Sequence, residues 1–106
     1  MGILIQGGRI VDAATDTDKK GDIYLEDGVI TEIGEKLKIK DKGDRVIDAK
    51  GCLVMPGLID LHFHGCMGDD FCDNSKEAIE NIAKYEASVG VTTIAPATMT
   101  LPVEEM

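Results

Sequence analysis

The sequence has no tryptophan, and only two tyrosines and two phenylalanines stand among its 106 residues. Hydrophobic residues still make up 43% of the chain, which argues against global disorder. Aliphatic side chains and methionine must therefore build the core. A chain of this length suits one small domain or a piece of a larger one.

Positive charge is also scarce, since 11 Lys and Arg residues face 20 Asp and Glu residues, a net charge of -9. Binding to nucleic acid or to an anionic membrane surface needs basic patches, so the composition argues against both kinds of partner. No apolar run approaches the roughly 20 residues of a membrane span. No signal peptide is visible, because the first residues soon become polar.

Cysteine is sparse, with Cys52, Cys66 and Cys72 as its only three occurrences. An odd, small number does not suit a secreted disulfide framework. We therefore expect reduced thiols and a cytoplasmic protein.

The first half of the chain, residues 1–55, has the texture of short strands joined by turns. The clearest signal is Asp27-Gly28, which predicts a tight hairpin because both turn positions need positive φ. The other expected features are strands at 3–6 and 9–12 flanking Gly7-Gly8, a polar loop at 14–20, a charged loop at 35–44, and two strands around Lys50-Gly51.

The second half predicts a strand at 58–64, a loop at 65–73, a helix from Asn74 to Gly90 and a strand at 91–96. Asn74 is expected to cap the helix, and Gly90 to end it. Thr100 and Pro102 favour the start of another helix. Strand, helix and strand in this order form a βαβ unit with parallel pairing, so the fold class is α/β.

Both histidines of the chain, His62 and His64, lie at the end of the strand expected at 58–64. Alternation places Asp60, His62 and His64 on one face. The opposite face carries Ile59, Leu61 and Phe63, and we expect it to pack under the helix.

Two imidazoles on one face can bind the same divalent ion, with zinc favoured over iron or manganese. We expect Asp60 to support this site as an outer carboxylate rather than as a ligand. Cys66 and Cys72 fit better as small buried or loop residues. The alternative is that both histidines are ordinary polar residues at a strand end.

The motif G-x-x-V-x-P-G-h-I-D-x-H-x-H, with h apolar, spans Gly51 to His64. It resembles the amidohydrolase superfamily, and the resemblance extends over the whole chain. It implies that residues 1–55 form the amino-terminal part of a β-sandwich. Residues 56–106 would begin a (β/α)₈ TIM barrel and contain its first βαβ unit.

The resemblance also implies hydrolysis of an amide in a small-molecule substrate by metal-activated water. His62 and His64 map onto the first pair of metal ligands, whereas no residue of this chain maps onto the catalytic aspartate or the remaining ligands. Substrate-binding residues are not assigned.

Within the superfamily, the runs HGCMGDDF and TTIAPATMT resemble N-acetylglucosamine-6-phosphate deacetylases. Dihydroorotase-like members usually carry arginine two residues after the second histidine, where this chain has Cys66. Deacetylation of N-acetylglucosamine-6-phosphate is therefore the favoured reaction. The alternatives are a cyclic-amide hydrolase, such as a dihydroorotase or hydantoinase, and a non-catalytic structural module.

A complete barrel takes about 250 residues. We therefore expect this chain to be an amino-terminal fragment that is inactive alone. Open strand edges and uncovered apolar faces predict a homo-oligomer, with exchanged strands as one route to it.

Overall fold

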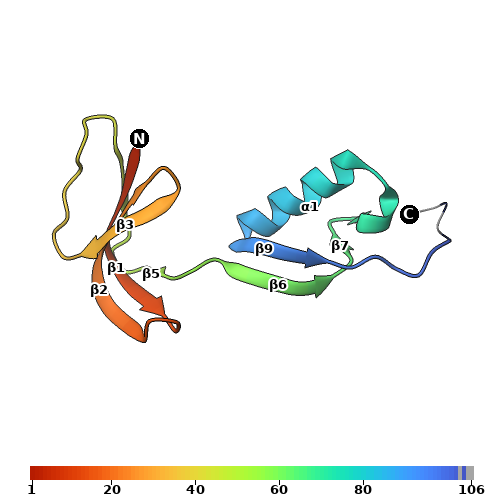
Figure 1. The fold of residues 1–106 in the computed structure, drawn as a ribbon, viewed down its shortest axis with the longest axis horizontal. Helices are drawn as coiled ribbons and strands as arrows, with labels where there is room; N and C mark the ends of the chain where they lie inside the picture. Colours follow the sequence, from red (N-terminus) through yellow and green to blue (C-terminus); the bar gives the residue numbers. More distant parts are fainter. Residues whose placement is uncertain (103, 105–106) are drawn as a thin grey trace. The chain divides into compact units, whose positions relative to one another are not determined.

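A computed structural model describes residues 1–102 and 104 of the chain. The chain forms two compact units, Met1–Pro56 and Gly57–Met106, and each is described by itself (Figure 1). Within the described residues, no helix is long and apolar enough to cross a membrane.

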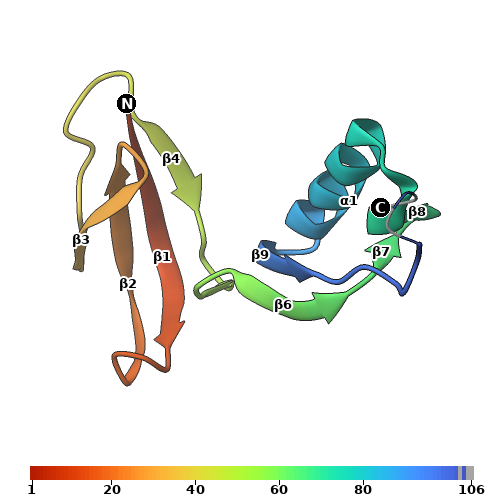
Figure 2. The ribbon, with the colours of Figure 1, turned by 45° about the vertical axis from the view of Figure 1, so that its right-hand side comes forward.

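The first unit is built on one five-stranded sheet. Its strands are β1 (Gly2–Asp12), β2 (Thr17–Glu26), β3 (Val29–Gly34), β4 (Arg45–Asp48) and β5 (Leu53–Val54). The order is β3-β2-β1-β4 (Figure 2), and β5 also pairs with β1. The pairs β1–β2 and β2–β3 are antiparallel, whereas β4 and β5 both run parallel to β1.

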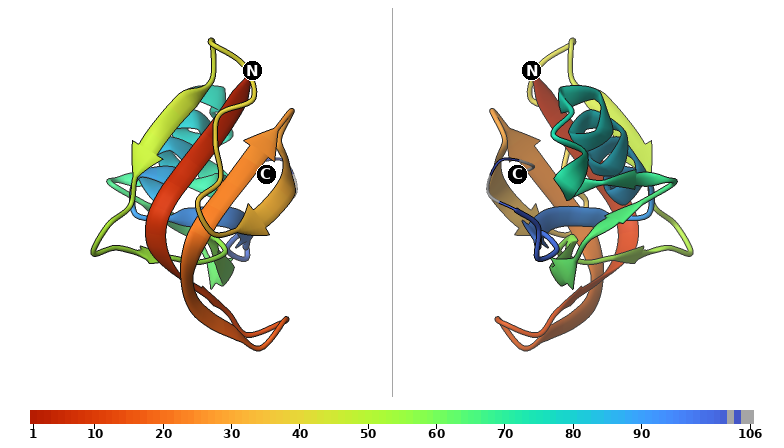
Figure 3. Two further views of the ribbon diagram at one scale, coloured as in Figure 1. Left: turned by 90° about the vertical axis from the view of Figure 1, so that its left-hand side faces the viewer. Right: turned by 90° about the vertical axis from the view of Figure 1, so that its right-hand side faces the viewer.

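The expected hairpin at Asp27-Gly28 is confirmed. The two residues have φ values of 50° and 79°, and Glu26 pairs with Val29 across the turn. The polar loop expected at 14–20 is wrong in its second half, because Thr17–Lys20 belong to β2. The β1–β2 hairpin is consequently long, and Figure 3 shows its twist.

The break expected between two strands at Gly7-Gly8 is also wrong, since β1 runs through it as one strand with a bulge. The pairing with β2 shifts between Ile5 and Gly8, and Gly7 takes a φ of 74°. Asp22 stabilises the bulge, because its Oδ1 accepts a hydrogen bond from the Gly7 N–H at 2.8 Å. A glycine pair can thus bend a strand instead of ending it.

Asp44 fastens the loop between β3 and β4 to the sheet. Its carboxylate accepts hydrogen bonds from the Tyr24 hydroxyl and from the backbone N–H groups of Gly2, Lys40 and Asp41. The ammonium group of Lys40 lies 4.4 Å from the centre of the Tyr24 ring. Tyr24 is only 1% exposed, so this unit has a core despite its few aromatic residues. The other buried apolar side chains here are Leu4, Ile10, Ile23 and Ala49.

The second unit contains a parallel strand pair and one α-helix. Its elements are β6 (Leu58–Phe63), β7 (Gly65–Cys66), β8 (Asp69–Asp70), the 3₁₀ turn η1 (Phe71–Asp73), α1 (Lys76–Ser88) and β9 (Val91–Pro96). The expected parallel pairing of β6 and β9 is confirmed, and α1 lies in the connection between them. In place of the single loop expected at 65–73, β7 and β8 form a small antiparallel hairpin. Thr100 and Pro102, expected to start a further helix, lie in neither a helix nor a strand.

Capping residues mark both ends of α1, but the residue expected to cap its amino end is wrong. Ser75 caps the helix, and its Oγ accepts a hydrogen bond from the Ala78 N–H at 3.3 Å. Asn74, the expected cap, instead has a φ of 48° and ends η1. Gly90, with a φ of 91°, follows the last turn as expected.

The apolar face of β6 is not covered as expected, because Ile59 is 60% and Leu61 77% exposed. Only Phe63 on that face finds an aromatic partner, in Phe71. The helix buries its own face against β9 and the β7–β8 hairpin through Ala78, Ile82 and Glu86.

Candidate metal centre

His62 and His64 lie side by side at the carboxyl end of β6. Their ring centres are 5.1 Å apart, and the ring planes meet at 87°. His62 is exposed and His64 is half-buried, so the pair opens to solvent on one side. Strand alternation accounts for this placement, since residues two apart share a face.

The ring of His64 is held by the segment that follows β9. Its Nδ1 lies 2.8 Å from the carbonyl oxygen of Ala97, and because a carbonyl can only accept, Nδ1–H is the donor. The neutral ring then keeps its lone pair on Nε2, the nitrogen that remains for a metal. Ala97 also donates its N–H to the Phe63 carbonyl at 2.9 Å. One residue therefore fixes both the strand end and the tautomer.

The hairpin that follows β6 fixes the His64 backbone from the other direction. The Phe71 N–H donates to the His64 carbonyl at 3.0 Å. The rings of Phe63 and Phe71 stack edge to face, with centres 5.1 Å apart. The segments on both sides of the histidine pair are thus anchored.

Two carboxylates lie close to this pair. Asp60 accepts the backbone N–H of His62 on Oδ1 at 3.1 Å, so it supports the strand end. Asp70 accepts the Cys72 N–H at 2.7 Å and caps η1. That hydrogen bond, the Cys72 side chain and the nearby His64 imidazole hold the pKa of Asp70 below its ordinary value.

The two cysteines of the second unit lie beside groups other than the two histidines. Burial raises the pKa of the Cys66 thiol, as does the nearby carboxylate of Glu86. Cys72 Sγ accepts the Met99 N–H at 3.1 Å. Within residues 1–102 and 104, no three His, Cys, Asp or Glu side chains gather as a group able to hold a metal.

The spacing of the two ring centres is compatible with a shared metal ion. In a tetrahedral zinc site with Zn–N bonds of about 2.1 Å, the centres of two imidazole rings lie roughly 5 Å apart. The observed separation of 5.1 Å matches that spacing. Two imidazoles still leave half of a tetrahedral shell to other donors.

Sequence reasoning placed the two histidines but missed the groups that hold them. The carbonyl of Ala97 leaves no trace in the side-chain pattern, and it lies 33 residues from His64. Asp70 could have been found, because an acidic residue three positions before Asp73 is a capping signal for the turn between them.

Comparison with known proteins identifies the family of the chain. A family model described as "Amidohydrolase family" matches residues 45–103. The chain belongs to the amidohydrolase family. The matched segment contains the whole Gly57–His64 part of the motif, so the resemblance found in the sequence is confirmed.

Curated relatives of this amidohydrolase chain include two dihydroorotases. The protein from Geobacter metallireducens is 39% identical over 106 residues, covering 99% of this chain and 24% of the relative. The protein from Acetivibrio thermocellus is 45% identical over 101 residues, covering 95% and 22%. The chain thus spans about a quarter of the length of the curated relatives it matches.

Solved structures of two enzymes with different names superpose on the chain. An N-acetylglucosamine-6-phosphate deacetylase from Pasteurella multocida superposes with a TM-score of 0.84 at 23% identity, covering 99% of this chain and 27% of that one. At that identity the likeness shows the fold alone. A D-hydantoinase superposes with a TM-score of 0.69 at 36% identity, covering 99% and 22%.

Proposed function

We propose that this amidohydrolase chain supplies the first two metal ligands, His62 and His64, of an enzyme that hydrolyses a C–N bond in a small amide. The single observation that carries the proposal is the 5.1 Å separation of the two rings on one face of β6. Family membership supports it, because both imidazoles belong to the motif that resembles the family's metal site.

A divalent ion bound here, with zinc preferred over iron or manganese, supplies a water of pKa about 7 and polarises the substrate carbonyl. The chain's own residues orient the ligands. Ala97 holds His64 with Nε2 free, and Asp60 holds the backbone of His62. With only these two ligands, the 106-residue chain by itself is expected not to hydrolyse amides.

We further propose that the reaction is deacetylation of an N-acetylated amino-sugar phosphate, such as N-acetylglucosamine-6-phosphate. The argument rests on Cys66, which stands where dihydroorotase-like members usually have arginine. Because cysteine has no guanidinium, this position offers no paired N–H donors to a substrate carboxylate, and the half-buried thiol lies close to the carboxylate of Glu86 instead.

The second candidate is hydrolysis of a cyclic amide. It is favoured by identities of 39% to a dihydroorotase and 36% to a D-hydantoinase. Assays of a protein that carries this chain at the length of its relatives separate the two. Release of acetate from N-acetylglucosamine-6-phosphate supports the deacetylase, and ring opening of dihydroorotate or a hydantoin without acetate release supports the alternative.

The metal proposal is tested on the 106-residue chain by zinc titration, followed through the imidazole nitrogen signals of the wild type and through the zinc that each variant retains after dialysis. We expect weak binding that shifts Nε2 of both histidines and is lost in the double variant His62→Ala/His64→Ala. The matched control, Cys66→Ser/Cys72→Ser, should keep it. Equal zinc uptake by the wild type and the histidine variant would contradict the proposal and favour a non-catalytic structural module.

We propose that residues 1–55 correspond to part of a β-sandwich and that residues 56–106, with β6, α1 and β9, contain the first βαβ unit of a (β/α)₈ barrel. We also propose that the chain associates with copies of itself, since Ile59 and Leu61 on β6 are largely exposed. Light scattering should give a mass above that of one chain, and Leu61→Lys should lower it. A monomeric wild type would contradict the association.

A further inference from the structure

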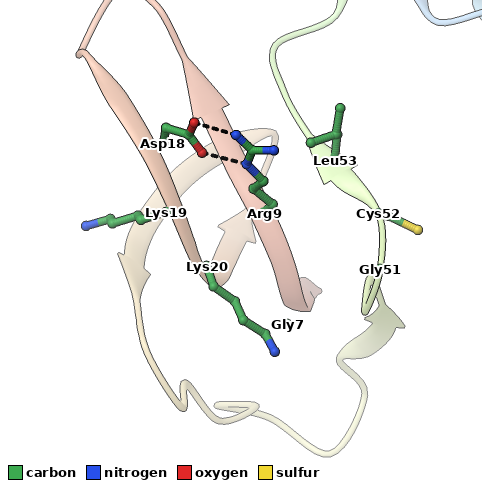
Figure 4. A pocket seen from close by; sticks show the side chains of 8 residues that line it. All are labelled: Gly7, Arg9, Asp18, Lys19, Lys20, Gly51, Cys52 and Leu53. Carbon is green, nitrogen blue, oxygen red and sulfur yellow. Dashed lines mark hydrogen bonds and ion pairs between the residues drawn. The ribbon is translucent and has the colours of Figure 1, made fainter.

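One side of the sheet in the first unit carries two adjoining hollows of about 560 and 530 Å³. They share Gly7 and Lys20, so together they form one groove along the β1 bulge. Figure 4 shows the first hollow, in which Lys20 reaches from β2 toward Gly7, while Lys19 points away from Arg9. We call the combined feature the bulge groove.

The bulge groove is rich in positive charge although the chain is acidic. Five of the 11 basic residues line it, against three of the 20 acidic ones. The basic residues are Arg9, Lys19, Lys20, Lys36 and Lys50, and the acidic ones are Asp18, Asp22 and Glu35. The rest of the chain is therefore even more acidic than its net charge of -9 indicates.

Two of the three carboxylates in the groove are already engaged. Asp18 receives both of its hydrogen bonds from the Arg9 guanidinium, at 2.7 and 2.6 Å. Asp22 is buried and accepts the backbone N–H groups of Gly7 and Leu37, at 2.8 and 2.9 Å. These two acids hold the arginine and the bulge, and only Glu35 remains to offset the lysines.

The lysines of the groove have little other neutralisation. Among the described residues, neither Lys20 nor Lys36 has a carboxylate within 4.0 Å, and Lys50 lies 3.9 Å from Asp48. The bulge makes room for Lys50, because a Cβ at position 7 would lie 3.0 Å from the Lys50 Cγ. The φ of 74° at position 7 also favours glycine there. The bulge thus lets the Lys50 stem lie close to β1, while its exposed ammonium group has only a long ion pair with Asp48.

We propose that the bulge groove binds a small polyvalent oxyanion of the phosphate type, independently of the histidine pair in the second unit. The ammonium groups of Lys20, Lys36 and Lys50, which line one hollow, are suited to a compact dianion, because each exposed charge adds a modest attraction. The groove is too small a basic surface for nucleic acid, which agrees with the acidity of the whole chain.

The test is titration of the 106-residue chain with inorganic phosphate, followed by the backbone amide signals of Gly7, Gly21 and Gly51. We expect saturable shifts that sodium chloride at matched ionic strength does not reproduce. Lys20→Gln/Lys50→Gln should weaken binding by about tenfold. Lys38→Gln/Lys42→Gln is the matched control, because it removes the same charge from the same unit outside the groove, and it should change binding by less than about twofold.

Several outcomes would overturn the proposal. Non-saturable shifts would show only general ion effects, and equal weakening by the two lysine variants would show attraction to net charge rather than to the groove. Loss of the response in His62→Ala/His64→Ala would place the anion at the histidine pair. A retained response in that variant supports a separate site, whether or not the histidines bind metal.

Discussion

The two units differ in what holds them together. Among the described residues, the first unit buries five apolar side chains, including Tyr24 and Leu4 at 1% exposure, whereas the second buries two, Ala78 and Ile82. A carboxylate in the first unit, Asp44, gathers four hydrogen bonds around a buried tyrosine. The second unit carries the candidate metal ligands on a strand with exposed apolar residues.

The comparison teaches that the histidine pair is ordered by local contacts rather than by a large core. His64 is held through the Ala97 carbonyl and the Phe71 N–H, both within 3.0 Å. Such contacts fix ring orientation without much buried area. The first unit instead derives its order from burial and from one buried ring. Substitutions that separate these two kinds of support should therefore affect the units unequally.

The largest effect is expected from removing the buried ring of the first unit. Tyr24→Ala should destabilise that unit by about 3–5 kcal/mol, because it deletes a fully buried aromatic and leaves a cavity. Tyr85→Ala is the matched control, since Tyr85 lies on α1 and is 39% exposed. Its cost should stay within about 1 kcal/mol.

Hydrogen exchange reads the two units separately. In Tyr24→Ala, amides of β1 and β2 should lose protection while those of α1 change little. Loss of protection in both units to the same degree would show that they unfold together, and the contrast drawn between them would be wrong.

The next effect is the pH dependence of the first unit that follows from Asp44 and Tyr24. The Tyr24 hydroxyl, followed by the backbone N–H groups of Asp41, Gly2 and Lys40, holds the pKa of Asp44 well below its ordinary value. A carboxyl whose folded pKa is depressed stabilises the fold above its unfolded pKa, and that stability is lost as the pH falls. Acid titration from neutral pH to below about pH 4 should therefore weaken the first unit.

Tyr24 gives the opposite dependence at high pH. Its hydrogen bond to Asp44, followed by burial, raises its pKa to about 12. A raised pKa stabilises the fold below the unfolded value of about 10, and that contribution disappears as the pH rises through the folded value. Asp44→Asn should flatten the acid limb of the stability curve and Tyr24→Phe the alkaline limb. If the acid limb in Asp44→Asn and the alkaline limb in Tyr24→Phe were unchanged, these two side chains would not cause the pH dependence of stability.

Part of this architecture could be predicted from sequence because its causes are local. The hairpin at Asp27-Gly28 follows from the φ values its turn needs, and the proximity of His62 and His64 follows from strand alternation. The family resemblance of the motif was equally local and is confirmed.

The features that could not be predicted from the sequence depend on contacts between residues far apart in the chain. Gly7-Gly8 reads as a turn until Asp22, 15 residues away, is seen to hold the bulge. The Asp44–Tyr24 bond and the His64–Ala97 bond span 20 and 33 residues. The bulge groove was hidden as well, because a net charge of -9 says nothing about where the cations lie.

The smallest effect expected is a difference in reaction rate between the thiols of the two units. Cys52 in the first unit is exposed, whereas Cys66 is half-buried and its pKa is raised by burial and by Glu86. Because the thiolate is the reactive form, iodoacetamide near neutral pH should modify Cys52 several times faster than Cys66. Peptide mass spectrometry after timed quenching measures both rates in one sample.

Glu86→Gln tests the cause, since it removes the negative charge beside Cys66 and should lower the thiol pKa and speed its alkylation. Glu80→Gln changes the same helix at an exposed position, so it should leave the Cys66 rate unchanged. If the two variants accelerated Cys66 equally, helix fraying rather than the Glu86 carboxylate would control the thiol. If Cys66 in the wild type reacted as fast as Cys52, the packing of the hairpin against α1 would be looser than the structure has it.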